Sequence, residues 1–211
     1  MLSLKLLAVS GCAGIIISLI CLIALHLLST PVHPIRDAIC DHASYRFGFL
    51  FQIQCAACGI SGLCLVAALV GLGYAGNSHG ALARLGLAAL VLFTLSRLAI
   101  IFFPSDIKGP RTVRGKAHMV FDVLMFVGIS YASAFLDYFL IRTRVVGMLP
   151  WATTGVILWA STALIDLCSV LTILTVSRPT WHKIMGLNER VLYLGILLWF
   201  GAAFIPLLGS I

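Results

Sequence analysis

Three polar connecting segments carry most of the side chains that could do chemistry in this otherwise apolar chain. They read DHASYR (residues 41–46), FPSDIKGPRTVRGKAHMVFD (residues 103–122) and TWHKIMGLNER (residues 180–190). Each contains histidine, arginine and a carboxylate, the residue types that serve in proton transfer, anion binding and metal ligation. If the three segments meet in space, they form a single polar site.

The second segment offers the most plausible acid or base. His118 and Asp122 are four residues apart, so on a helix they share one face. A carboxylate beside a histidine orients its ring and stabilises the protonated form, which suits proton transfer near neutral pH. We therefore assign candidate catalytic roles to His118, Asp106 and Asp122. The sequence contains no complete catalytic signature, so an enzyme and a binding protein both stay open.

Arginines in and beside these segments indicate a site for an anion. The planar guanidinium group donates two parallel hydrogen bonds, which suits a phosphate or carboxylate group. The same excess of cations also arises from contacts with lipid head groups, which is the simpler interpretation of the loop arginines. The candidate substrate-binding residues are Arg46, Arg97, Arg111, Arg114, Glu189 and Arg190.

Two further chemistries are alternatives. His42, His118 and His182 are candidate metal ligands, with Asp106 to polarise a zinc-bound water, although no HExxH motif or similar spacing is present. Cys55 and Cys58 form a C-x-x-C pair that would suit thiol and quinone redox chemistry, with Cys40 in the loop before it. Cysteine within an apolar segment also behaves as a small apolar residue. No cofactor is assigned.

The segments between these polar connections are long enough to cross a bilayer. Of the 211 residues, 61% are hydrophobic and 10% are charged, and the mean hydropathy is +1.11. About 20 consecutive apolar residues span a membrane as a helix, whereas membrane strands alternate in polarity. The sequence predicts an all-α polytopic membrane protein, a single six-helix domain over residues 1–211. The expected spans are 4–28, 47–73, 81–103, 117–141, 151–176 and 191–208.

This topology places the polar segments together and suggests the ligand. In a six-span chain, loops one, three and five share one membrane face, and their lysines and arginines predict that this face is cytoplasmic. We expect an integral protein of a prokaryotic cytoplasmic (inner) membrane that binds or processes an anionic lipid or other amphipathic molecule. Membrane lipids are the expected partners, and a homo-oligomer is possible. A small-solute transporter or a scaffold is a further alternative. Nucleic acid is excluded, because the +7 net charge is divided among membrane loops.

Two charged residues are predicted to lie inside the membrane near this face. Arg97 is six residues before the end of span three, which places it roughly 9 Å below the face at 1.5 Å per residue. Asp122 lies at a similar depth in span four. Because a charge in hydrocarbon is costly, we expect an Arg97–Asp122 ion pair, which together with His118 would form a buried triad. Asp166, in the middle of span five, has no cation at matching depth.

Several short motifs resemble one family. FPSD (103–106), GKAH (115–118), the GLNERV and LW elements between 186 and 199, and SYRFGFLFQ at the start of span two are similar to the six-helix prokaryotic membrane family known as domain of unknown function 998. The resemblance covers essentially the whole chain. It implies that Pro104, Asp106, His118, Glu189 and Arg190 are the family-type positions, and it implies no activity. The first loop, with Cys40 and two prolines, departs from the family pattern.

Overall fold

The computed structural model of the protein is built from helices. Six helices are long and apolar enough to cross a membrane, and the residues that the structure describes include no strand. The predicted all-α, six-helix architecture is therefore confirmed. The structure describes residues 2–28, 30–76, 80–106, 112–142, 151–177 and 183–209.

The six long helices follow the predicted spans, and short 3₁₀ helices accompany them within the described residues. Continuous apolar sequence favours helices here, because a backbone in lipid must satisfy its own hydrogen bonds. The elements are α1 (Leu2–Leu27), η1 (Ile39–Ser44), α2 (Gly48–Gly71), α3 (Gly80–Ala99), η3 (Ile100–Phe102), α4 (Val113–Arg142), α5 (Trp151–Ser177) and α6 (Met185–Gly209).

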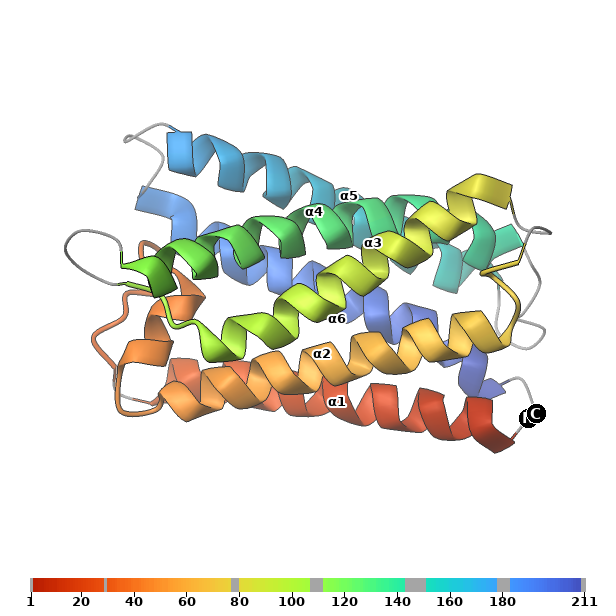
Figure 1. Ribbon diagram of the computed structural model, residues 1–211, viewed down its shortest axis with the longest axis horizontal. Coiled ribbons are helices and arrows are strands. Elements are labelled where there is room, and N and C mark those ends of the chain that lie inside the picture. The colour runs from red at the N-terminus through yellow and green to blue at the C-terminus, as the bar shows by residue number, and fades with distance from the viewer. Residues whose placement is uncertain are drawn as a thin grey trace.

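The helices form a closed ring in chain order. Each long helix packs against its neighbours in the sequence, and α6 packs back against α1 (Figure 1). Helix α6 also contacts α2 and α4. The apolar stretch of α6 is 67% buried, compared with 33% for α4 and for α5, so α6 is the innermost helix. Polar side chains in its first turns, Asn188 and Glu189, consequently contact other segments of the protein.

The segments before α2, α4 and α6 lie at one end of the bundle, at the left of Figure 1, and the chain termini lie at the other end. Hydrogen bonds join these segments. The Ser105 hydroxyl donates to Cys40 O over 3.1 Å, and Leu187 N donates to Ile35 O over 3.0 Å. This meeting of the odd-numbered loops was predicted and is confirmed for the described residues. We call residues 30–47, 103–106, 112–122 and 183–190 the polar end.

Two helices begin earlier than hydropathy predicts. Helix α4 begins at Val113 instead of residue 117, and α6 begins at Met185 instead of residue 191. At α4 the reason is a capping residue, because the Thr112 hydroxyl accepts a hydrogen bond from Gly115 N at 3.1 Å. The first turns of both helices are polar, so an apolar window does not include them.

Close packing of α3 against α4 depends on a glycine. A Cβ atom at Gly128 would lie 2.7 Å from Phe93 N and 2.9 Å from Ala89 O, and these are backbone atoms that cannot rotate away. We expect Gly128→Ala to lower the free energy of unfolding by about 1–2 kcal/mol, after alanine's better helix propensity is allowed for. The midpoint of thermal unfolding in detergent should fall by about 2–8 °C.

Gly201 in α6 provides the matched control, because a Cβ there would meet nothing within 4 Å. Gly201→Ala should leave the unfolding midpoint unchanged or raise it, since alanine favours the helix. Equal effects of the two substitutions would contradict a close α3–α4 contact at Gly128.

Candidate functional site

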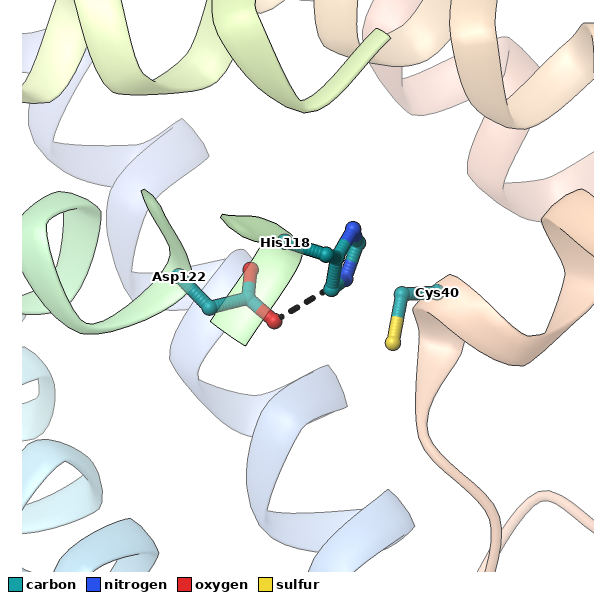
Figure 2. A group of neighbouring side chains, drawn as sticks. All are labelled: Cys40, His118 and Asp122. Atoms are coloured by element: carbon teal, nitrogen blue, oxygen red, sulfur yellow. Dashed lines mark ion pairs between the residues drawn. The ribbon is translucent and has the colours of Figure 1, made fainter. Parts of the chain in front are cut away.

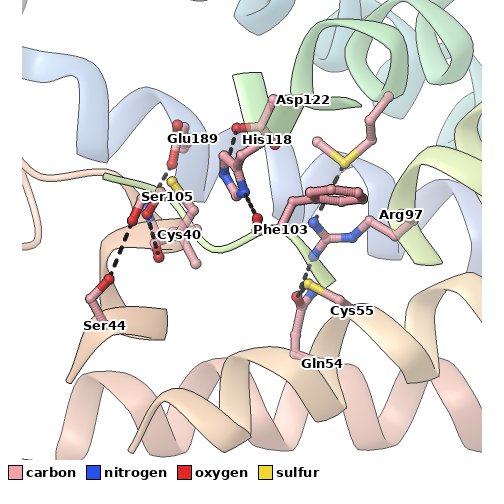
Figure 3. A network of polar contacts seen from close by, with 12 residues as sticks. Cys40, Ser44, Gln54, Cys55, Arg97, Phe103, Ser105, His118, Asp122 and Glu189 are labelled. Atoms are coloured by element: carbon pink, nitrogen blue, oxygen red, sulfur yellow. Dashed lines mark hydrogen bonds and ion pairs between the residues drawn. The ribbon is translucent and has the colours of Figure 1, made fainter. Parts of the chain in front are cut away.

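His118 is held in one orientation at the polar end. Its Nδ1 lies 2.6 Å from Phe103 O, and because a carbonyl only accepts, Nδ1 carries a hydrogen (Figure 3). Its Nε2 lies 3.2 Å from Asp122 Oδ2. The predicted placement of His118 and Asp122 on one helical face is confirmed. Phe103, the first residue of the FPSD motif, thus fixes the tautomer of the histidine in the GKAH motif.

Asp106 binds the beginning of α4. Its Oδ2 accepts a hydrogen bond from Thr112 N at 2.7 Å, and its Oδ1 accepts one from the Thr112 hydroxyl at 3.0 Å. A Cβ at Gly115 would lie 1.8 Å from Asp106 Oδ2, so glycine is needed for this close approach. A carboxylate is also favoured by the positive end of the helix dipole. These contacts make Asp106 a positioning residue for the beginning of α4. Its predicted catalytic role stays a prediction.

The GLNER motif attaches the beginning of α6 to the first loop. Gly186 lies so close to this loop that a Cβ would be 2.3 Å from Asp37 O. The Glu189 carboxylate is buried and accepts a hydrogen bond from Ile39 N at 2.7 Å. Asn188 instead binds α5, donating to Cys168 O over 2.9 Å. The motif therefore holds the beginning of α6 against both the first loop and α5.

Arg190 connects the first loop with α1. Its Nη1 donates to Asp37 O over 3.0 Å and to Gly186 O over 2.7 Å, while its Nε donates to His26 Nε2 over 2.5 Å. The other ring nitrogen of His26, Nδ1, lies 2.6 Å from Leu22 O. These two contacts require the same neutral tautomer of His26. The remaining nitrogen of the guanidinium, Nη2, is buried and has no hydrogen-bond partner.

An apolar groove of about 350 Å³ extends to His26 and Arg190. It lies between α1 and α6, and leucine and isoleucine side chains make up most of its walls. Ile23, Leu27 and Leu194 are wall residues with exposed side chains, so the groove opens on the outer surface of the bundle. His26 and Arg190 give its wall cationic and hydrogen-bonding groups at the polar end.

Cys40 lies beside His118 and Asp122. One ligand atom from each of these residues falls within 4.8 Å of the others, and Figure 2 shows the three side chains together. This group spans η1 and the beginning of α4. Desolvation raises the pKa of the Cys40 thiol well above its usual range, and the carboxylates of Asp122 and Glu189 raise it further. The thiol is therefore protonated at neutral pH when no cation is bound beside it.

His42 and Asp41 lie in the same 3₁₀ helix but have other surroundings. His42 is buried, with Nδ1 3.5 Å from the Thr30 hydroxyl and its ring centroid 5.8 Å from that of His26. Burial, together with the positive charge of Arg190, lowers the pKa of His42 to about 4. His42 is consequently neutral at pH 7. Desolvation raises the pKa of the Asp41 carboxyl.

Arg97 is fully buried, but the predicted Arg97–Asp122 ion pair is absent from the described residues. The guanidinium group donates instead to Gln54 Oε1 in α2 (Figure 3) and to Met125 Sδ at 3.5 Å. It also lies 4.7 Å from the ring centroid of Tyr193. The side chain thus extends into the bundle interior towards α2 and α6. Asp122 pairs with His118 on its own helix.

The other predicted site residues are dispersed. Arg46 and Arg114 are exposed, and the guanidinium group of Arg46 lies 5.5 Å from the ring centroid of Phe47. Neither makes an ion pair with the described residues. Arg111 and His182 lie outside the described residues. The polar end therefore brings together His118, Asp122, Glu189 and Arg190, whereas Arg97 lies deeper in the bundle.

Two functional candidates were missed by sequence reasoning. Cys40 was noted only as a departure from the family pattern and as a neighbour of the C-x-x-C pair, and the structure places it against His118. Asp137 was overlooked within a long apolar run, although it is fully buried and hydrogen-bonded to Thr162 and Trp199. An isolated carboxylate inside a predicted span is the signal that would have identified it.

Comparison with known proteins agrees with the motifs. The family described as "Protein of unknown function (DUF998)" matches residues 12–205, a range that reaches into all six helices. The chain belongs to the DUF998 family. None of the curated proteins and none of the solved structures compared with the chain matches it. For a DUF998 protein the site must therefore be interpreted from its own geometry.

In this DUF998 protein the family-type positions Asp106, His118, Glu189 and Arg190 lie at the polar end. Asp106 and His118 join the third loop to α4, and Glu189 and Arg190 join α6 to the first loop. The motifs consequently have a structural role, because their hydrogen bonds hold the loops against the helices. They also enclose the Cys40, His118 and Asp122 group and border the groove between α1 and α6.

Proposed function

We propose that this DUF998 integral membrane protein binds an anionic phospholipid. The observation that carries the proposal is the apolar groove between α1 and α6 with Arg190 and His26 in its wall at the polar end. The lipid chain would occupy the groove, and the phosphate would lie at Arg190. The volume of about 350 Å³ falls within the range of ligand pockets, roughly 300–1,000 Å³.

The charge at the end of the groove favours an anionic head group. Arg190 has no carboxylate among its hydrogen-bond partners, which are His26 and two backbone carbonyls. Its positive charge is consequently not neutralised by direct contact, and Nη2 is a donor without a partner. A head group with net negative charge is therefore favoured over one in which a choline cation balances the phosphate.

The experiment compares two lipids that differ only in head group. We expect purified protein in mild detergent, measured by native mass spectrometry, to retain dioleoylphosphatidylglycerol in preference to dioleoylphosphatidylcholine. Arg190→Ala should weaken binding of the anionic lipid roughly 10- to 150-fold, the value of one charge-assisted hydrogen bond. Arg114→Ala removes an exposed arginine of the polar end that does not line the groove, and it should bind as wild type.

A second pair of variants tests the groove without changing Arg190. Leu194→Trp fills the groove, whereas Leu198→Trp places the same side chain one turn further along α6, outside the groove. Both leucines are exposed, so neither substitution should disturb the core. The proposal is wrong if Arg190→Ala and Leu194→Trp both retain the anionic lipid, or if the two lipids bind equally well to the wild type.

The thiol redox alternative has less support. Cys55 and Cys58 are 0% and 1% exposed, and both lie inside α2. A redox partner would have to open the bundle to reach them. The transporter and scaffold alternatives have no specific observation in their favour, and we do not propose them.

A further inference from the structure

One buried histidine nitrogen at the polar end has no hydrogen-bond partner. His118 is 3% exposed, and its Nε2 has no hydrogen-bond partner. Because Nδ1 carries the hydrogen that is donated to Phe103 O, Nε2 of the neutral ring has a free lone pair. Buried polar atoms without a partner are uncommon, and each needs an explanation.

The neighbours of this nitrogen are ligands for a transition metal. Asp122 Oδ2 lies 3.2 Å from Nε2 but without the geometry of a hydrogen bond. The Cys40 sulfur completes a group whose ligand atoms fall within 4.8 Å of one another. In metal sites the second nitrogen of a ligating histidine commonly donates to a backbone carbonyl, as His118 Nδ1 does to Phe103 O.

The distances agree with a shared ion. Two nitrogen or oxygen ligands, each about 2.0–2.1 Å from tetrahedral zinc, lie roughly 3.3 Å apart, and a sulfur ligand lies roughly 3.6 Å from either of them. The separation of 3.2 Å between His118 Nε2 and Asp122 Oδ2 fits this geometry. The Cys40 thiol needs a shift of roughly 1 Å, which a side-chain rotation provides.

Charged residues of both signs surround the group. Asp41 in η1, Asp122 in α4 and Glu189 in α6 all act on the Cys40 thiol. Arg97 and Arg190 face the same region from α3 and α6, and their hydrogen-bond partners are neutral. The carboxylate of Asp122, within the group itself, is therefore the anionic ligand for a cation.

We propose that Cys40, His118 and Asp122 bind one zinc ion at the polar end. The set differs from the histidines that the sequence suggested, because His42 lies against His26 and His182 lies outside the described residues. Three protein ligands leave the fourth tetrahedral position open, which is typical of zinc sites that hold a water molecule. The site does not depend on lipid binding in the groove.

The test measures metal binding directly. Protein in mild detergent is stripped with a chelator, titrated with Zn²⁺ or Co²⁺, and analysed for metal content and for cobalt absorption. We expect one ion per chain, with a sulfur-to-cobalt charge-transfer band. Cys40→Ala, His118→Gln and Asp122→Asn should each weaken binding at least tenfold, and Cys40→Ala should abolish the charge-transfer band.

Three control variants keep the experiment specific. Cys12→Ser, His42→Phe and Asp166→Asn change the same residue types outside the group, and each should bind metal as wild type. If His118→Gln does not fold, Cys40→Ala decides the result, because Ser105 and Glu189 hold this segment through backbone atoms. The proposal is overturned if the wild type takes up no metal, or if Cys40→Ala and Asp122→Asn retain wild-type affinity.

Discussion

Replacing Asp137 with alanine is expected to lower the free energy of unfolding by about 2–6 kcal/mol. Asp137 in α4 is fully buried, and its carboxylate accepts hydrogen bonds from the Thr162 hydroxyl at 2.6 Å and from Trp199 Nε1 at 2.7 Å. These donors belong to α5 and α6, so one carboxylate joins three helices. The substitution leaves two buried donors without an acceptor, and each costs about 1–3 kcal/mol. The midpoint of thermal unfolding in detergent should fall by at least about 4 °C.

A double-mutant cycle separates these hydrogen bonds from a general loss of packing. Thr162→Val removes one donor at similar volume. Trp199→Phe removes the other donor and also leaves a cavity, because the phenyl ring is smaller than the indole. Each should be destabilising in the wild type and much less so together with Asp137→Ala, because the partner is already lost. Additive effects would mean that the carboxylate does not couple the three helices. Asp166→Ala, in a partly exposed position of α5, should have a smaller effect.

The six-helix architecture could be predicted because helices that cross a bilayer need long apolar sequences. Long apolar runs determine the number of spans, and because each span crosses the membrane once, alternate loops share a face. The order of the helices in the ring does not follow from hydropathy, and neither do the polar first turns of α4 and α6. Those turns depend on Thr112, Asp106 and Glu189, whose partners lie in other segments.

The site was predictable only where its contacts are local. His118 and Asp122 were paired correctly because four residues separate them on one helix. Arg97 was assigned to Asp122 by matching charge and depth, a method that considers only charged partners. Its actual partners, Gln54 and Met125, are neutral. Gln54 also lies in α2, outside the α3–α4 pair that the prediction considered. Cys40 lies outside the spans, and its distance from His118 depends on how the first loop folds.

Replacing Glu189 with alanine should release the first loop from α6. Ile39 is 1% exposed, and its N–H donates to Glu189 Oε2 over 2.7 Å. Losing this acceptor costs about 1–3 kcal/mol and leaves a small cavity worth about 1 kcal/mol, so we expect a loss of about 2–4 kcal/mol in all. The unfolding midpoint should fall by about 4–16 °C. Hydrogen exchange measured by mass spectrometry should show lower protection of peptides that cover η1.

Glu189→Gln separates the hydrogen bond from the charge. The amide oxygen still accepts from Ile39 N, so stability and protection of η1 should stay within about 1 kcal/mol of wild type if the acceptor is what matters. Leu187→Ala changes an exposed side chain on the same turn of α6, and it should leave the protection of η1 unchanged. Undiminished protection of η1 in Glu189→Ala would show that other contacts hold the loop. Because η1 carries Cys40, the alanine variant should also weaken the proposed zinc site, whereas the glutamine variant should weaken it only through the lost charge.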